Sequence, residues 1–266
     1  MTLGYWNSQF DFRSLLPDFQ TYLDSMGARS NAVSLAFDRH SYGDHPRQFV
    51  ELSGTPQSIL PVFVHGGYWR ALTADTHRFA LPHFAKEHGA IANLEYRLLP
   101  EVTLVEIVED ALAGLGKIAD QTGARLFVLG HSAGGHLAVM GALRCPEIVV
   151  GAVGISGLYD LTPLPWTFLR EEVGLTAADL KGQSPLEEWD AGPADNILVA
   201  VGENETPEFH RQMHVFSNTH GATTFTVPGA HHMTVLDALA DPYSALNTAI
   251  RTRIQTARSG SSTSGP

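Results

Sequence analysis

Residues 125–143 read RLFVLGHSAGGHLAVMGAL. The first part of this stretch is an apolar run of strand length, and the last part has the apolar spacing of a helix. Between them stands Gly130-His131-Ser132-Ala133-Gly134, so Ser132 occupies a sharp turn from strand to helix. Such a turn strains the serine backbone and exposes the hydroxyl at a helix N-terminus, where the helix dipole favours negative charge. We therefore interpret Ser132 as a nucleophile, and a helix-capping serine is the alternative.

The rest of the chain continues this alternation of strands and helices. Apolar runs predict strands at 48–52, 59–65, 90–96, 125–131, 149–156, 196–202 and 223–227. Helical spacing is found at 12–25, 76–88, 102–121, 136–144, 208–219 and 243–255. Several of the strands are almost wholly apolar, as strands buried on both faces are. The order predicts an α/β fold with a mostly parallel central sheet and helices on both faces.

The 266 residues favour one domain, which we expect to span residues 1–257. Residues 158–192 interrupt the alternation with several prolines, two tryptophans and short helical patterns. We interpret this segment as a small cap inserted into the domain, and a surface excursion is the alternative. The Ser/Gly-rich residues 258–266 are expected to form a disordered tail.

Charge and composition exclude several classes of protein. The net charge of −11 disfavours binding to nucleic acid. No apolar run is long enough to span a bilayer, and the first residues lack a secretion signal, so we expect a cytoplasmic protein without a membrane partner. The single cysteine, Cys145, excludes an internal disulfide and a thiolate-rich metal site. His210 and His214 have a metal-ligand spacing but lack the glutamate of zinc-protease helices, so we interpret them as helix surface. The oligomeric state stays open.

A second motif, HGGYW at 65–69, directly follows the apolar strand at 59–65. Consecutive glycines let backbone amides approach a substrate closely. The amides of Gly66 and Gly67, with that of Ala133, are therefore candidates for an oxyanion hole that stabilises a tetrahedral intermediate. We interpret His65 as a structural residue that holds this loop.

These motifs carry a resemblance to a known family. With HGGYW at 65–69 and GHSAGGHLA at 130–138, the chain resembles the α/β-hydrolases related to kynurenine formamidase. The likeness covers most of the chain and includes YGDHPRQFVEL at 42–52, YRLLPEVTL at 96–104, SGLYDL at 156–161 and GENETPEFHRQ at 202–212. The resemblance implies an α/β-hydrolase fold, a serine mechanism without metal or cofactor, and a small acyl substrate.

The remaining catalytic groups follow from the order serine, acid, histidine that α/β-hydrolases use. Two adjacent histidines near the C-terminus, His231 and His232, are candidates for the base. The histidine of the family usually precedes a bulky apolar residue, here Met233, which favours His232. The family normally has an aspartate three residues beyond the glycine that ends the preceding strand. This chain has Glu205 there instead, and Glu203 is the alternative acid.

Three aromatic residues, Tyr68, Trp69 and Trp166, are candidates for the substrate pocket, and packing in the core or cap is the alternative for each. Arg170 is a candidate donor for a substrate carboxylate. The resemblance favours hydrolysis of N-formylkynurenine to kynurenine and formate through an acyl-serine. A short-chain carboxylesterase is the second hypothesis. A catalytically inactive binding protein on the same fold is the third, and the altered acid is its only support.

Overall fold

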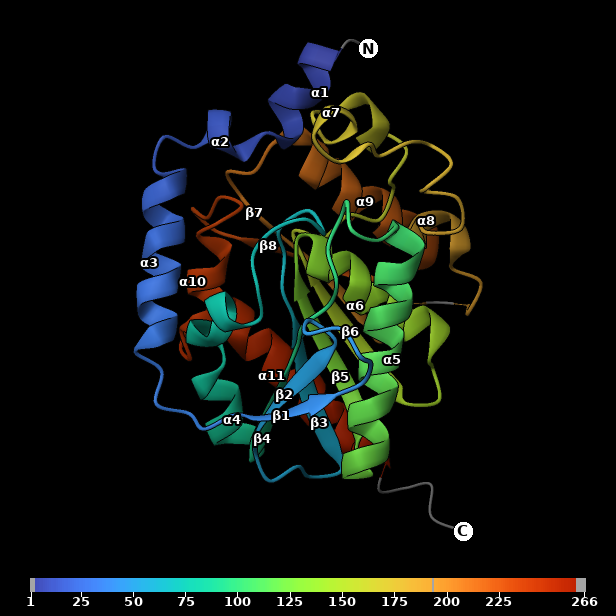
Figure 1. Ribbon diagram of the computed structural model, residues 1–266. Helices are drawn as coiled ribbons and strands as arrows, with labels where there is room; N and C mark the ends of the chain where they lie inside the picture. The colour runs from blue at the N-terminus through green and yellow to red at the C-terminus, as the bar shows by residue number, and fades with distance from the viewer. Residues whose placement is uncertain (1–2, 193, 262–266) are drawn as a thin grey trace.

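The computed structural model describes residues 3–192 and 194–261, and at its centre lies an eight-stranded sheet flanked by helices (Figure 1). The strand order is β1-β2-β4-β3-β5-β6-β7-β8, and β2 runs antiparallel to both of its neighbours. All other neighbouring pairs are parallel. The strands are β1 Asp38–Ser41, β2 Phe49–Gly54, β3 Ile59–Val64, β4 Ala90–Leu94, β5 Arg125–His131, β6 Val149–Ile155, β7 Ile197–Gly202 and β8 Thr223–Val227. The carboxyl ends of β3 to β8 therefore meet at one edge.

Helices cover both faces of the sheet because successive residues of each central strand point to opposite sides. On β3, Leu60, Val62 and Val64 belong to the apolar cluster that also contains residues of α5, α6 and α9. Ile59 and Phe63 belong to a second cluster, with residues of α3, α4, α10 and α11. The helices are α1 Leu3–Phe10, α2 Phe12–Leu15, α3 Phe19–Asn31, α4 Pro82–His88, α5 Leu104–Thr122, α6 Ala133–Arg144, α7 Leu169–Val173, α8 Pro185–Glu188, α9 Pro207–His220, α10 Val235–Ala240 and α11 Ala245–Ser261, with 3-10 turns η1 Asp75–Ala80 and η2 Leu164–Trp166. The predicted α/β fold with a mostly parallel sheet is confirmed.

The N-terminal region differs from the prediction. The single helix expected at 12–25 is instead two helices, α2 and α3, and α1 precedes them. The break lies at Pro17, because the residue before a proline is pushed out of the helical region. Leu16 accordingly has φ −113° and ψ 109°. The edge strand β1, with sequence DRHS, was not predicted because its residues lack an apolar alternation.

The C-terminal end also differs. Helix α11 continues to Ser261, so residues 258–261, expected to belong to a disordered tail, are helical. Residues 262–266 of that expected tail lie outside the described residues. Residues 158–192, interpreted as a cap, contain only the short elements η2, α7 and α8. No helix in the described ranges is both long and apolar enough to cross a membrane.

Four histidines are buried without positive charge in the sheet and its flanking elements, and one of them is His88 of α4, whose pKa burial lowers to about 4. Burial lowers the pKa of His77 to about 3 and that of His136 to about 4, and it lowers the pKa of His131 well below its ordinary value. His136 Nε2 donates to the carbonyl oxygen of Gln183 over 2.7 Å. This bond links α6 to the segment before α8.

We expect these histidines to make the fold acid-sensitive. Because their pKa values are lower in the folded than in the unfolded chain, the unfolded chain binds more protons below pH 6.5, and stability falls as pH falls from 6.5 toward 4. A single such histidine lowers the free energy of unfolding by about 2 kcal/mol between pH 7 and pH 5. Urea denaturation at both pH values measures this loss. His136→Gln should reduce the difference, whereas Met140→Ala, a cavity variant in the same helix, should lower stability equally at both. An unchanged difference in His136→Gln would contradict the account.

Candidate active site

Ser132 lies at the turn between β5 and α6 with φ 55° and ψ −120°, a conformation that non-glycine residues rarely adopt. Two glycines permit this turn. A Cβ added at Gly130 would lie 1.9 Å from the carbonyl oxygen of Gly134, and one at Gly134 would lie 2.1 Å from that of Val64. The turn is held from the neighbouring strand, because Ser132 N donates to the carbonyl oxygen of Ile155 over 2.8 Å. Ser132 is buried in the protein but lines a pocket.

His232 lines the same pocket and is bound to a carboxylate. Its Nδ1 donates to Glu205 Oε2 over 2.7 Å, and both side chains are buried. The bond fixes the tautomer of the neutral ring, with the proton on Nδ1 and the lone pair on Nε2. An imidazole in this state can accept a proton from a hydroxyl group in the pocket.

Glu205, and not Glu203, contacts the histidine. The second oxygen of Glu205, Oε1, accepts hydrogen bonds from Ser156 Oγ over 2.5 Å and from Gly202 N over 2.8 Å. These bonds curl the glutamate back toward the end of β7, which accommodates its extra methylene. Glu203 instead accepts from the backbone N–H of Gly229 at the surface.

Ser156 is a residue of this site that the sequence analysis missed. It follows the end of β6 with φ 51°, a second strained position at the same edge of the sheet as Ser132. Its hydroxyl holds the carboxylate of Glu205. The signal in the sequence was weak, because a serine followed by a glycine after a strand is also typical of an ordinary turn.

The adjacent histidine, His231, has a different role. Its Nδ1 accepts a hydrogen bond from Met233 N over 3.2 Å, and its backbone N–H donates to Thr234 Oγ1 over 2.9 Å. These bonds shape the turn that leads into α10. His231 is half-buried and lies outside the pocket lining, whereas His232 is part of it.

Three aromatic rings surround His232. The ring of Phe12 stacks on it with centroids 3.9 Å apart and planes 9° apart, and the ring of Phe209 lies 4.6 Å away. His131 lies 4.8 Å away, and its Nε2 donates to the carbonyl oxygen of His232 over 2.8 Å. His131 therefore contacts the backbone of the candidate base. The stacking of Phe12 on His232 was not predicted from the sequence.

The HGGYW loop leaves β3 beside Ser132. Gly67 has φ 111°, and an added Cβ there would lie 2.2 Å from the carbonyl oxygen of Ala71. A Cβ at Gly66 would lie 2.8 Å from the carbonyl oxygen of His131 and 3.1 Å from the Cβ of Ser132. Gly67 is therefore needed for the loop's own turn, and Gly66 for the loop to lie against the serine turn, which is where amide donors of an oxyanion hole would act.

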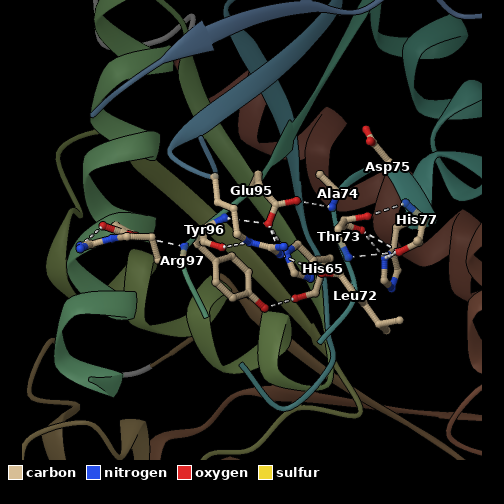
Figure 2. A network of polar contacts seen from close by, with 12 residues as sticks. His65, Leu72, Thr73, Ala74, Asp75, His77, Glu95, Tyr96 and Arg97 are labelled. Carbon is tan, nitrogen blue, oxygen red and sulfur yellow. Dashed lines mark hydrogen bonds and ion pairs between the residues drawn. The ribbon is translucent and has the colours of Figure 1, made fainter. Parts of the chain in front are cut away.

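A buried network, shown in Figure 2, anchors this loop from behind. Glu95 accepts from His65 Nε2 over 3.1 Å, from Arg47 Nη2 over 2.5 Å and from Ala74 N over 2.8 Å. The ring of Tyr96 stacks on that of His65 with centroids 4.2 Å apart, and its hydroxyl donates to the carbonyl oxygen of His65 over 2.8 Å. His65 is thus held on several sides, and its Nδ1 donates to the carbonyl oxygen of Gly66.

The pocket has a volume of about 310 Å³ and is lined mainly by residues of the N-terminal segment 11–23 and of the segment 67–72. Of the three aromatic residues predicted to line it, only Tyr68 does. Trp69 is fully buried and packs edge-on against His136. Trp166 is 56% exposed and lies beside a separate surface hollow. The structure corrects both expectations, because the register of the loop and of η2 turns these rings away.

The expected cap contributes less to the pocket than the N-terminal helices do. From residues 158–192 only Phe168 lines it, and the N-terminal segment contributes a larger set. That set comprises Asp11, Phe12, Arg13, Phe19, Gln20 and Leu23. Burial raises the pKa of Tyr68 well above its ordinary value, so its hydroxyl stays protonated and donates to the carbonyl oxygen of Phe10 over 2.7 Å. The HGGYW loop is thereby bonded to the N-terminal segment.

In the described part of the chain, acidic and histidine side chains outside the pocket do not gather into a metal site. Among residues 3–192 and 194–261, no three His, Cys, Asp or Glu residues lie close enough to hold a metal ion. His214 is exposed on α9, and His210 Nε2 donates to the carbonyl oxygen of Glu203 over 3.3 Å.

Known proteins share this arrangement of elements. Residues 61–183 match a family model described as the α/β-hydrolase fold. The chain has the α/β-hydrolase fold. The kynurenine formamidase of Danio rerio is 26% identical over 78% of this chain and 76% of its own length, and that of Drosophila melanogaster is 27% identical over 76% and 69%.

Solved structures agree on the fold. A Silicibacter sp. protein provisionally named a thioesterase superimposes with a TM-score of 0.78 and 29% identity over 89% of this chain and 95% of its own. An esterase from Pyrobaculum calidifontis superimposes with a TM-score of 0.70 over 97% and 96%, at 19% identity. The α/β-hydrolase chain described above thus resembles both formamidases and esterases.

The contact of Glu205 with His232 yields a prediction. In Glu205→Gln the negative charge that would stabilise an imidazolium is lost, so kcat/KM for p-nitrophenyl acetate should fall at least about 100-fold. Glu203→Gln, a matched change in the same loop, should alter it by less than about threefold. Initial rates with purified variants measure both. Equal losses in the two variants would mean that the carboxylate acting on the base lies elsewhere.

Proposed function

We propose that the protein is a serine hydrolase that removes a small acyl group through an acyl-serine intermediate, and that its substrate is an aryl formamide of the N-formylkynurenine type. The observation that carries the proposal is the buried 2.7 Å contact between Glu205 and His232, in a pocket that Ser132 also lines. The similarity to kynurenine formamidases over three quarters of the chain supports the choice of a formamide.

In the first half of the proposed reaction, Ser132 Oγ attacks the formyl carbon while His232 Nε2 takes its proton. Glu205 stabilises the resulting imidazolium and keeps the ring in its orientation. The oxygen that becomes negative accepts hydrogen bonds from the amides of Gly66, Gly67 and Ala133. Loss of one such donor typically slows a reaction about 100- to 1000-fold.

The leaving group then departs as a neutral amine. The imidazolium of His232 gives its proton to the aryl nitrogen, the C–N bond breaks, and the formyl group remains on Ser132. A water molecule, deprotonated by His232, attacks this ester, and formate leaves as the serine hydroxyl regains its proton. These steps need only the chain's own residues and water.

The shape of the pocket supports a small substrate with an aromatic ring. Its volume of about 310 Å³ lies at the lower end of ligand sites, which span about 300–1,000 Å³. Phe12, Tyr68 and Phe168 line it, and an aromatic pair contributes about 0.5–1.5 kcal/mol beyond burial. Formyl is the smallest acyl group, so most of this space is open to the leaving group.

A short-chain carboxylesterase is the second candidate, since the same groups would cleave an ester and esterases share the fold. The third hypothesis, an inactive binding protein, rested on the replacement of the family aspartate by a glutamate. The replacement gives that hypothesis little support, because the glutamate contacts His232 at the distance of a charge-assisted hydrogen bond.

A substrate panel tests the proposal. We expect wild-type protein to hydrolyse N-formylkynurenine with a higher kcat/KM than p-nitrophenyl acetate or butyrate. Ser132→Ala should fold normally and lose at least about 1000-fold for all three, because the catalytic groups act as a unit. If the esters turn over and the formamide reacts no faster than with Ser132→Ala, the protein is a carboxylesterase. Retention of more than a tenth of the wild-type rate by that variant would remove Ser132 from the mechanism.

A further inference from the structure

Two arginines line the pocket that contains Ser132 and His232. Arg13 belongs to α2, and Arg70 directly follows the HGGYW loop. The side chain of Arg13 is 61% exposed, whereas that of Arg70 is largely buried, at 17% exposed. The chain as a whole carries a net charge of −11, which makes two guanidinium groups at one opening a local exception.

Both arginines contact the same carboxylate. Glu172 of α7 pairs with Arg70 Nη2 through one oxygen and lies 3.5 Å from Arg13 Nη1 through the other. Figure 1 shows α2 and α7 at the same end of the sheet, which brings these residues together from distant parts of the chain. Arg70 also lies over the ring of Phe168, with 5.6 Å between the guanidinium carbon and the ring centroid. Its position is therefore held on two sides.

A fourth charged residue, Asp11, lies at this opening, whereas Glu172 contacts the two arginines without lining the pocket itself. Asp11 lines the pocket, and its carboxylate accepts a hydrogen bond from Ser14 Oγ over 2.7 Å. We call Asp11, Arg13, Arg70 and Glu172 the charged rim. The charged rim carries two positive and two negative groups, so it is neutral as a whole and offers both signs at short range.

The chemistry of these groups selects one kind of ligand. Each guanidinium has five N–H donors, so a single shared carboxylate leaves donors for a second one. A free ammonium group would be attracted by Asp11, the carboxylate that lines the pocket. A molecule with only a carboxylate would meet two like charges, whereas a zwitterion matches both signs. The repulsion from distant acidic residues is screened over about 8 Å at physiological ionic strength, so the rim dominates locally.

We propose that the charged rim binds the zwitterionic α-amino-acid end of the leaving group, with the carboxylate on Arg13 and Arg70 and the ammonium group facing Asp11. This inference rests on the proposed function, because it assigns the leaving group of the same reaction. It also replaces an expectation from the sequence. Arg170, considered there as the carboxylate donor, is exposed on α7 and does not line the pocket.

Binding to a protein that cannot turn over tests the subsite by itself. In the Ser132→Ala background, calorimetry compares kynurenine with 2-aminoacetophenone, which has the same aryl ketone but lacks the amino-acid end. We expect kynurenine to bind at least about tenfold more tightly than 2-aminoacetophenone. Arg70→Gln added to this background should weaken the binding of kynurenine about 10- to 100-fold, so that the two ligands bind with nearly equal affinity. Arg170→Gln, the same change at an arginine of α7 outside the pocket, should leave the ratio of the two affinities unchanged.

Turnover separates the failure of this inference from that of the proposed function. The ratio of kcat/KM for N-formylkynurenine to that for 2-formamidoacetophenone should fall about 10- to 100-fold in Arg70→Gln and stay constant in Arg170→Gln. If neither formamide is hydrolysed but kynurenine still binds through Arg70, the proposed function fails and the subsite stands. If kynurenine binds no more tightly than 2-aminoacetophenone, or Arg70→Gln and Arg170→Gln behave alike, the subsite is refuted whatever the enzyme hydrolyses.

Discussion

The close approach of α6 to the carboxyl ends of β3 and β5 is the constraint on which the rest of this site depends. It exists because Gly130 and Gly134 have no Cβ: one at Gly134 would lie 2.1 Å from the carbonyl oxygen of Val64. The approach forces Ser132 to φ 55°, at a cost of about 1–3 kcal/mol. Two large apolar clusters, one on each face of the sheet, offset that strain. The HGGYW loop continues from Val64, so the same constraint sets the distance between Ser132 and this loop.

The N-terminal segment packs against the loops at the sheet edge that form the candidate site. Phe12 stacks on His232, and Tyr68 of the loop donates to the carbonyl oxygen of Phe10. Thr206, just after Glu205, donates through Oγ1 to the carbonyl oxygen of Gln9 over 2.9 Å. Residues 9–12 therefore contact the loops that carry the candidate base, the candidate acid and the oxyanion candidates. Packing of this segment and the orientation of the site are energetically coupled.

The sequence predicted those features that local patterns encode. Strand and helix periodicity predicted the fold, and the position at which the related family has its acid favoured Glu205, with Glu203 as the alternative. The sequence could not predict contacts between residues far apart in the chain, such as Phe12 on His232 or Ser156 on Glu205, because these contacts depend on tertiary packing. The predictions that Trp69 and Trp166 line the pocket were wrong for the same reason. A motif fixes the place of a residue along the chain but not the direction of its side chain. The charged rim joins the start of α2, the residue that follows HGGYW and α7, and no single stretch of sequence contains it.

The central claim is that Ser132 is activated by His232, which Glu205 holds. The most direct measurement uses diethyl p-nitrophenyl phosphate, which transfers its phosphoryl group to an activated serine, with peptide mapping by mass spectrometry and the release of p-nitrophenol followed in parallel. The account predicts one diethylphosphoryl group per chain, on the peptide that contains Ser132, with a rate at least about 100-fold lower in His232→Ala and little changed in His231→Ala. A label on another residue, or an undiminished rate in His232→Ala, would contradict it.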